Sequence, residues 1–200
     1  MKIVLIISAD AEWRVIKELL QNQPIPTSPY GEYASVSMEK GQLVIFQGGW
    51  GKISAAASTQ YVIDHFHPDL IVNLGTCGGF SDRIQTGTVI LVERTLVYDI
   101  LEQMGDSEEA IAHYSTTLDL TWLPKELPAP VTRGLLISAD RDIVGDEISS
   151  LINQYGAVAA DWESASIAWV AQKNGIRVLI LRAVTDLVGD KGGEAYGNIG

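Results

Sequence analysis

The chain has 200 residues, of which 46% are hydrophobic, a length and composition typical of one globular domain with a sizeable core. Its 25 acidic and 14 basic residues give a net charge of −11, which argues against binding to nucleic acid or to an anionic membrane. The single cysteine, Cys77, excludes an intramolecular disulfide framework, and no Cys/His spacing suggests a zinc site. The apolar start, residues 3–7, is too short for a signal peptide or a membrane span, so we expect a cytoplasmic protein.

Hydrophobic periodicity divides the first third of the chain into strands and helices. Continuous or alternating apolar runs indicate strands, and apolar side chains three and four residues apart indicate helices. The expected strands are residues 2–8, 33–38 and 42–47, and the expected helices are residues 12–21 and 52–66. Glycines 48, 49 and 51 precede the second helix, an arrangement that suits an anion or a hydroxyl-rich ligand. Lys52 could be a charged contact for such a ligand, although a lysine in a first helical turn is more often solvated.

The same alternation continues to the end of the chain without a break in composition. The expected strands are residues 69–74, 88–99, 131–138, 157–160 and 176–184, the expected helices are residues 148–155 and 163–173, and the least regular stretch is 100–130. The pattern predicts an α/β fold with a central, mostly parallel, twisted sheet flanked by helices, in a single domain over residues 1–200.

Three carboxylates stand where predicted strands end. Glu12 follows the first strand, Glu163 follows residues 157–160, and Asp186 ends the last strand before a Gly-rich loop at 188–193. Acids at strand exits lie where open α/β folds bind ligands, and together they suggest acid/base chemistry on a polar small molecule. Taken singly, Glu12 and Glu163 are also explained as favourable charges in first helical turns.

The segment Gly75-Thr76-Cys77-Gly78-Gly79 directly follows a predicted strand. Its glycines allow either a close approach by a ligand or a tight turn with positive φ, and its spacing fits neither a P-loop nor a dinucleotide fingerprint. Cys77 has no basic neighbour in the sequence and is better explained as a small packing residue than as a nucleophile.

Four ordered segments resemble the nucleoside phosphorylase/nucleosidase superfamily, and within it the 5′-methylthioadenosine/S-adenosylhomocysteine nucleosidases. These segments are residues 49–57, 68–80, 161–163 and 182–186, preceded by the N-terminal strand with Glu12. The resemblance runs from Lys2 to about Lys191. It implies a small-molecule nucleoside substrate, no cofactor or metal, and a homodimer.

The resemblance also implies a role for each matching residue. Asp186 would protonate the departing base, Glu163 would bind the ribose 2′- and 3′-hydroxyls, and Glu12 would activate the attacking water. An acid at the base and negative charge near the sugar suit this reaction, because the transition state carries positive charge on the ribose and negative charge on the base. The other substrate-binding residues would be Gly75, Thr76, Cys77, Gly78, Asp142, Ile143, Trp162 and Thr185, with Thr185 and Arg182 supporting Asp186.

Three departures from the family pattern bear on the substrate. Asp142 stands where the nucleosidases usually have an aromatic or apolar residue, and Trp162 replaces their methionine. These two positions therefore leave the identity of the base and of the 5′ substituent undecided. Trp162 is placed to stack on a flat base. The chain stops at Gly200, whereas family members continue into another helix.

The leading hypothesis is hydrolysis of a purine nucleoside to free base and sugar. The substrate expected under this hypothesis is a 5′-modified adenosine such as methylthioadenosine or S-adenosylhomocysteine. Phosphorolysis is an alternative that Arg14 keeps open, although an acid at position 12 would repel phosphate. A third possibility is a nucleoside-binding module without turnover.

Overall fold

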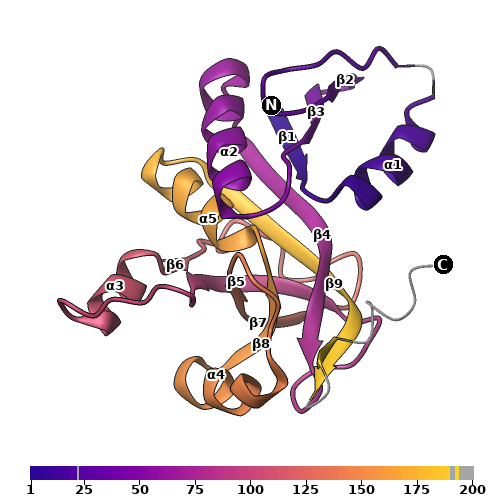
Figure 1. The fold of residues 1–200 in the computed structure, drawn as a ribbon. Helices are drawn as coiled ribbons and strands as arrows, with labels where there is room; N and C mark the ends of the chain where they lie inside the picture. Colours follow the sequence, from indigo (N-terminus) through magenta and orange to yellow (C-terminus); the bar gives the residue numbers. More distant parts are fainter. Residues whose placement is uncertain (22, 190–191, 194–200) are drawn as a thin grey trace.

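The structure is a computed structural model that describes residues 1–21, 23–189 and 192–193 (Figure 1). Its strands are β1 (Lys2–Ile7), β2 (Tyr33–Met38), β3 (Gly41–Gln47), β4 (Leu70–Phe80), β5 (Val89–Val97), β6 (Thr116–Thr117), β7 (Thr132–Ser138), β8 (Ala157–Asp161), β9 (Arg177–Gly189) and β10 (Gly192–Gly193). Its helices are α1 (Asp10–Leu19), α2 (Lys52–Phe66), α3 (Ser107–His113), α4 (Ile148–Tyr155), α5 (Ser164–Lys173) and a short 3₁₀ helix, Gly145–Glu147. Within this described part, no helix has the length and apolar character needed to span a bilayer.

The strands form one mixed sheet in the order β10-β9-β5-β7-β8-β4-β1-β3-β2, with β6 beside β5. The long pairings of β1 with β3 and β4, of β4 with β9 and of β5 with β7 are parallel. The predicted α/β fold with a mostly parallel sheet is therefore confirmed. Because β4 pairs with both β9 and β8, the circuit β4-β9-β5-β7-β8 closes on itself, a feature on which the alternation of strands and helices made no prediction.

Helices cover both faces of the part of the sheet around β1. Val4 and Ile6 belong to the core cluster that includes α2, whereas Ile7 packs in a separate cluster with Trp13 of α1. Side chains alternate between the two faces of a strand, so the continuous apolar run of β1 is buried on both sides, as predicted. Figure 1 shows α2 and α5 side by side along β4 and β9, away from α1.

The glycine segment after Leu74 is part of a strand, so the tight turn that was one of its two explanations is excluded. β4 continues through it to Phe80, and none of Gly75, Gly78 and Gly79 has a positive φ. A Cβ on Gly75 would lie 1.9 Å from Nη1 of Arg182, so this glycine is needed for close approach between β4 and β9. The register with β9 shifts between Cys77 and Gly78, which is an irregularity of the bulge type.

The predicted end of the last strand was wrong, whereas the stretch 100–130 is poor in regular structure, as expected. β9 does not end at Val184 but runs on to Gly189, so Asp186 lies within the strand and not beyond it. The stretch 100–130 contains α3 and β6, and α3 begins where the Asp106 carboxylate accepts N–H bonds from Glu108 and Glu109 at 2.8 and 3.2 Å. Part of the Gly-rich loop predicted at 188–193, residues 190–191, lies outside the described residues, as does the chain end at Gly200.

Candidate active site

A cavity of about 490 Å³ lies where β4, β8 and β9 meet the start of α1 and the segment after β7. Ten of the twelve predicted site residues line it, namely Glu12, Thr76, Cys77, Gly78, Asp142, Ile143, Trp162, Glu163, Thr185 and Asp186. Gly75 and Arg182 are not among the residues that line it. Three carboxylates more than twenty residues apart in sequence thus share one cavity, because the starts of α1 and α5 and the last part of β9 meet there.

Glu12 joins α1 to β4 through its side chain. Its Oε1 accepts hydrogen bonds from the N–H and the Oγ1 of Thr76, at 2.7 and 2.9 Å, and its Oε2 accepts a longer bond from the N–H of Ala9 at 3.4 Å. Glu12 lies in the first turn of α1, where a negative charge is favoured. The donors of Thr76, which could otherwise bind an anionic reactant, are therefore already occupied by a carboxylate.

Asp186 is half-buried near the end of β9. Its Oδ1 accepts a hydrogen bond from Oγ1 of Thr185 at 3.1 Å. Its Oδ2 lies above Gly78, where an added Cβ would be 3.9 Å away. The carboxyl group thus faces β4 across the cavity wall, and Thr185 stands beside it as expected.

Glu163 caps the N-terminus of α5 and is only 8% exposed. Its Oε1 accepts the N–H of Gly51 at 3.0 Å, and its Oε2 lies 3.9 Å from Nη2 of Arg182. Burial, and next the negative charge of Asp161, raise the pKa of Glu163 to about 7, although Arg182 and the Gly51 N–H oppose the shift. Near neutral pH this carboxyl group is therefore divided between its neutral and ionised forms.

Arg182 supports Glu163 and not Asp186, which corrects the expectation from the sequence. The fully buried guanidinium donates from Nε to Asp161 and from Nη2 to Asn73, both at 2.8 Å. Asp161 in turn accepts the N–H of Glu163 at 3.2 Å and the Oγ of Ser138 at 2.6 Å. The buried ion pair between Arg182 and Asp161 holds the Asp161 carboxylate, and this carboxylate in turn binds the backbone N–H of Glu163.

Sequence reasoning assigned no role to Asp161, Asn73 or Ser138. Each is a polar residue in or at the end of an apolar strand, and buried polar groups need partners. That combination was the available signal. A polar residue in an apolar strand indicates that its side chain has a hydrogen-bond partner. The identity of that partner depends on which strands are neighbours.

Cys77 and Trp162 complete the wall of the cavity. Burial raises the pKa of the Cys77 thiol to about 12, so the group stays protonated and is not a nucleophile at neutral pH. The Trp162 ring lies 5.3 Å from the ring of Trp50, tilted by 56°. The Trp162 indole therefore presents an aromatic surface at the cavity, next to Glu163.

The glycine-rich turn before α2 was predicted to suit an anion or a hydroxyl-rich ligand. Its N–H groups instead bind carboxylates of the protein: Gly51 binds Glu163, and Lys52 binds Oδ1 of Asp140 at 2.6 Å. Lys52 is not simply solvated, because its ammonium group pairs with Asp99.

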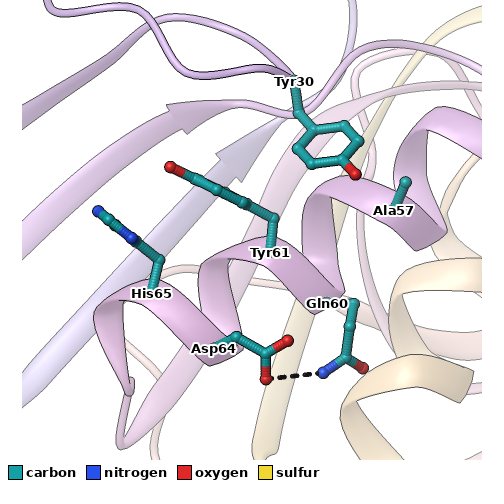
Figure 2. A pocket seen from close by; sticks show the side chains of 6 residues that line it. All are labelled: Tyr30, Ala57, Gln60, Tyr61, Asp64 and His65. Atoms are coloured by element: carbon teal, nitrogen blue, oxygen red, sulfur yellow. Dashed lines mark hydrogen bonds between the residues drawn. The ribbon is translucent and has the colours of Figure 1, made fainter.

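Another cavity, of about 430 Å³, lies beside α2, where Tyr30 from the segment before β2 faces the helix (Figure 2). It is lined by Tyr30, Ala57, Gln60, Tyr61, Asp64 and His65. Gln60 donates to Asp64 at 3.0 Å, and the rings of Tyr61 and His65 are stacked with centroids 5.1 Å apart. It is lined by one acid and by none of the predicted site residues, so the cavity at β4 and β9 is the candidate active site. Over residues 1–21, 23–189 and 192–193, no group of three or more His, Cys, Asp or Glu side chains could hold a metal ion.

Comparison with known proteins identifies the family of the chain. The family model described as "Phosphorylase superfamily" matches residues 2–198. The 5′-methylthioadenosine/S-adenosylhomocysteine nucleosidase of Buchnera aphidicola is 30% identical, over 94% of this chain and 84% of the relative.

Two solved structures share the fold. The nucleosidase of the same name from Campylobacter jejuni matches with a TM-score of 0.81 at 20% identity, covering 94% of this chain and 87% of its own. A mutant of futalosine hydrolase from Helicobacter pylori matches with a TM-score of 0.79 at 17% identity, covering 92% and 89%. The chain therefore belongs to the phosphorylase superfamily and, within it, to the family of the 5′-methylthioadenosine/S-adenosylhomocysteine nucleosidases.

Proposed function

We propose that this protein is an N-glycosyl hydrolase that splits a purine nucleoside into free base and sugar. Its substrate is a 5′-modified adenosine such as methylthioadenosine or S-adenosylhomocysteine, the compounds in the name of the Buchnera relative. The observation that carries the proposal is the convergence of Glu12, Glu163 and Asp186 on one cavity.

Each carboxylate has a separate task in this reaction. Asp186 donates a proton to the base as the N-glycosidic bond breaks, which removes negative charge from the leaving group. Glu163 in its ionised form accepts hydrogen bonds from the ribose hydroxyls. Glu12, oriented by Thr76, takes a proton from the water that attacks the anomeric carbon. The positive charge that develops on the ribose is stabilised by the surrounding carboxylates.

Water is a better nucleophile than phosphate for this cavity. The Thr76 donors are taken by Glu12, so an incoming phosphate would meet a carboxylate where it needs hydrogen-bond donors. Arg14, the residue that kept phosphorolysis open, is exposed and does not line the cavity. Arg141 does line it, but its guanidinium forms two bonds to Glu147, at 3.1 and 2.6 Å.

The base and the 5′ substituent are the least constrained parts of the proposal. Asp142 and Ile143 line the cavity, which supports a role in substrate selection for the acid found in place of an aromatic or apolar residue. A fold neighbour bears the name futalosine hydrolase, so the fold alone does not select the substrate.

The proposal is tested by measuring release of free base from a panel of nucleosides in phosphate-free buffer. We expect release of adenine from methylthioadenosine, with no stimulation by added inorganic phosphate. Strict dependence on phosphate would instead identify a phosphorylase. Calorimetric binding of the nucleoside without any release would identify a binding module.

We further propose that the active form is a cytoplasmic homodimer built from this one domain, residues 1–200. The resemblance to the nucleosidases supports the dimer. Two large apolar side chains near the start of α2, Trp50 and Ile53, are 60% and 82% exposed in the single chain and are candidates for burial. Light scattering after size-exclusion chromatography tests this, and a monomer at micromolar concentration would contradict it.

A further inference from the structure

Lys52 is a charged residue beside the cavity that the proposed reaction does not use. Its Nζ donates to Oδ1 of Asp99 and lies 3.9 Å from Oδ2 of Asp140, residues 47 and 88 positions away in the sequence. The side chains are only partly exposed, Lys52 at 23% and Asp99 at 15%. Charges in this setting interact more strongly than charges in open solvent.

Backbone hydrogen bonds close the cluster formed by Lys52, Asp99 and Asp140. The N–H of Lys52 binds Oδ1 of Asp140 at 2.6 Å, and the N–H of Asp140 binds Oδ2 of Asp99 at 3.0 Å. One ammonium group thus lies between two carboxylates that follow β5 and β7. Without it the two acids would repel each other, and the start of α2 would lose its side-chain link to Asp99 and keep only the backbone N–H bond to Asp140.

The cluster is directly continuous with two walls of the cavity. Gly51, next to Lys52, donates its N–H to Oε1 of Glu163 at 3.0 Å. It has φ +86°, and a Cβ there would lie only 3.2 Å from Oδ1 of Asp140, so the Asp140 carboxylate packs closely against the Gly51 backbone. On the other side, Asp140 leads into residues 141–143, all of which line the cavity.

We propose that Lys52 is a positioning residue for the nucleoside site. Held by Asp99 and Asp140, it keeps the Gly51 N–H on Glu163 and the 141–143 segment against the cavity. The ribose then meets a carboxylate in the correct place, although Lys52 itself touches no reacting atom. This inference rests on the function proposed above, since it concerns the same site.

Loss of the Lys52 charge has a specific electrostatic consequence. Glu163 faces Asp161 from β8, Arg182 from β9, Glu12 from α1 and the Gly51 N–H from the start of α2. The Gly51 N–H favours the ionised form, so its displacement raises the pKa of Glu163 further. The pH at which the ribose-binding form of Glu163 appears therefore moves upward.

Lys52→Met is the first variant to measure, because it keeps most of the side-chain volume and removes the charge. We expect KM for the nucleoside to rise roughly ten- to a hundredfold, with a smaller change in kcat. The acidic limb of the pH profile of kcat/KM shifts upward. Lys52→Arg restores most of both values, because it keeps a cation between Asp99 and Asp140.

Lys17→Met is the matched control, since Lys17 forms an ion pair with Glu32 at 2.9 Å and does not line the cavity. It leaves KM and the pH profile unchanged. A Lys52→Met protein with wild-type KM and an unshifted pH profile would overturn the proposal. A Lys52→Met protein that differs from wild type only in a lower thermal stability, which Lys52→Arg does not restore, would also overturn it.

Two measurements distinguish a failure of the Lys52 role from a failure of the proposed hydrolase function. Carboxyl NMR titration of Glu163 in the ligand-free protein reports its pKa without any substrate, and we expect an upward shift in Lys52→Met relative to wild type. If the wild-type protein releases no base, the proposed function fails while this titration still decides the role of Lys52. If Lys52→Met does not fold, Asp99→Asn replaces it, with a smaller shift in the same direction expected and an unchanged titration contradicting the role.

Discussion

At the scale of single residues, Asp186 is the group on which turnover depends most. An asparagine there keeps the size and a hydrogen-bonding side chain but cannot donate a carboxyl proton to the base. We expect Asp186→Asn to lower kcat by about 10²- to 10⁴-fold, the usual contribution of a general acid. Its thermal unfolding midpoint stays close to that of the wild type. Steady-state assay of base release, with unfolding measured by circular dichroism, gives both quantities.

Asp82→Asn is the control for that substitution, because Asp82 is exposed in the turn after β4 and does not line the cavity. We expect wild-type kinetics from it. If Asp186→Asn turned over at the wild-type rate, the proton donor would have to be another group.

The residues that could be predicted are those whose position follows from where an element begins or ends. Glu12, Glu163 and Asp186 stand near the ends of apolar runs, and the structure places all three in one cavity. Arg182 shows the limit of such reasoning. It precedes Asp186 by four positions, but its bonds go to Asp161 and Asn73, and those depend on which strands are neighbours.

At the scale of elements, the glycines of β4 have a function that composition could not separate from turn formation. A Gly-rich run after a strand often signals a turn, and the sequence left a turn and close approach by a ligand as alternatives here. In the structure Gly75 leaves room for a buried arginine from β9, with the Glu12 carboxylate close by. Whether a glycine provides a turn or space depends on the neighbouring strand, which is far away in sequence.

The close approach of β4 and β9 at Gly75 predicts that an alanine there destabilises the protein. In Gly75→Ala the added Cβ would lie 1.9 Å from Nη1 of Arg182 and 3.0 Å from Oε1 of Glu12, so the guanidinium has to move. We expect a loss of about 1–3 kcal/mol in the free energy of unfolding, typical of overpacking, together with weaker nucleoside binding. Chemical denaturation and calorimetric titration measure the two effects.

Gly105→Ala provides the comparison for Gly75→Ala. Gly105 lies in an exposed segment, and the nearest atom to an added Cβ there is 3.7 Å away in the Glu102 side chain. We expect little change from it. Equal stability of the two alanine variants would show that β4 and β9 are not as tightly apposed as this geometry requires.

At the scale of the whole molecule, the sequence predicted the layers but not the closure of the sheet. Alternating strands and helices gave the α/β class, and β1 is buried on both faces as its apolar run implied. Periodicity carries no information on partners, so the pairing of β4 with both β8 and β9 could not be foreseen. That closure brings Thr76, Glu163 and Asp186 to the same cavity.

The same closure places an acid in a poorly hydrated site, and this links function to the stability of the entire fold. The pKa of Glu163 rises from 4.5 to about 7 on folding, so the folded state binds the proton more tightly than the unfolded chain does. The corresponding stability is complete below about pH 4.5 and is lost as the pH rises through about 7. The loss is on the order of 3 kcal/mol.

Glu163→Gln should therefore be more stable than the wild type at high pH and should bind the nucleoside more weakly. The amide stays neutral at every pH, so the variant should not lose this contribution, and at pH 8 it should unfold at a temperature several degrees above the wild type. At pH 4.5 the two proteins should be similar, and nucleoside binding should be weak in the variant throughout. Thermal unfolding between pH 4.5 and 8 tests this, with Glu18→Gln on the exposed side of α1 as the matched control. A constant difference in midpoint between wild type and Glu163→Gln across that range would mean that the fold does not hold the proton on Glu163.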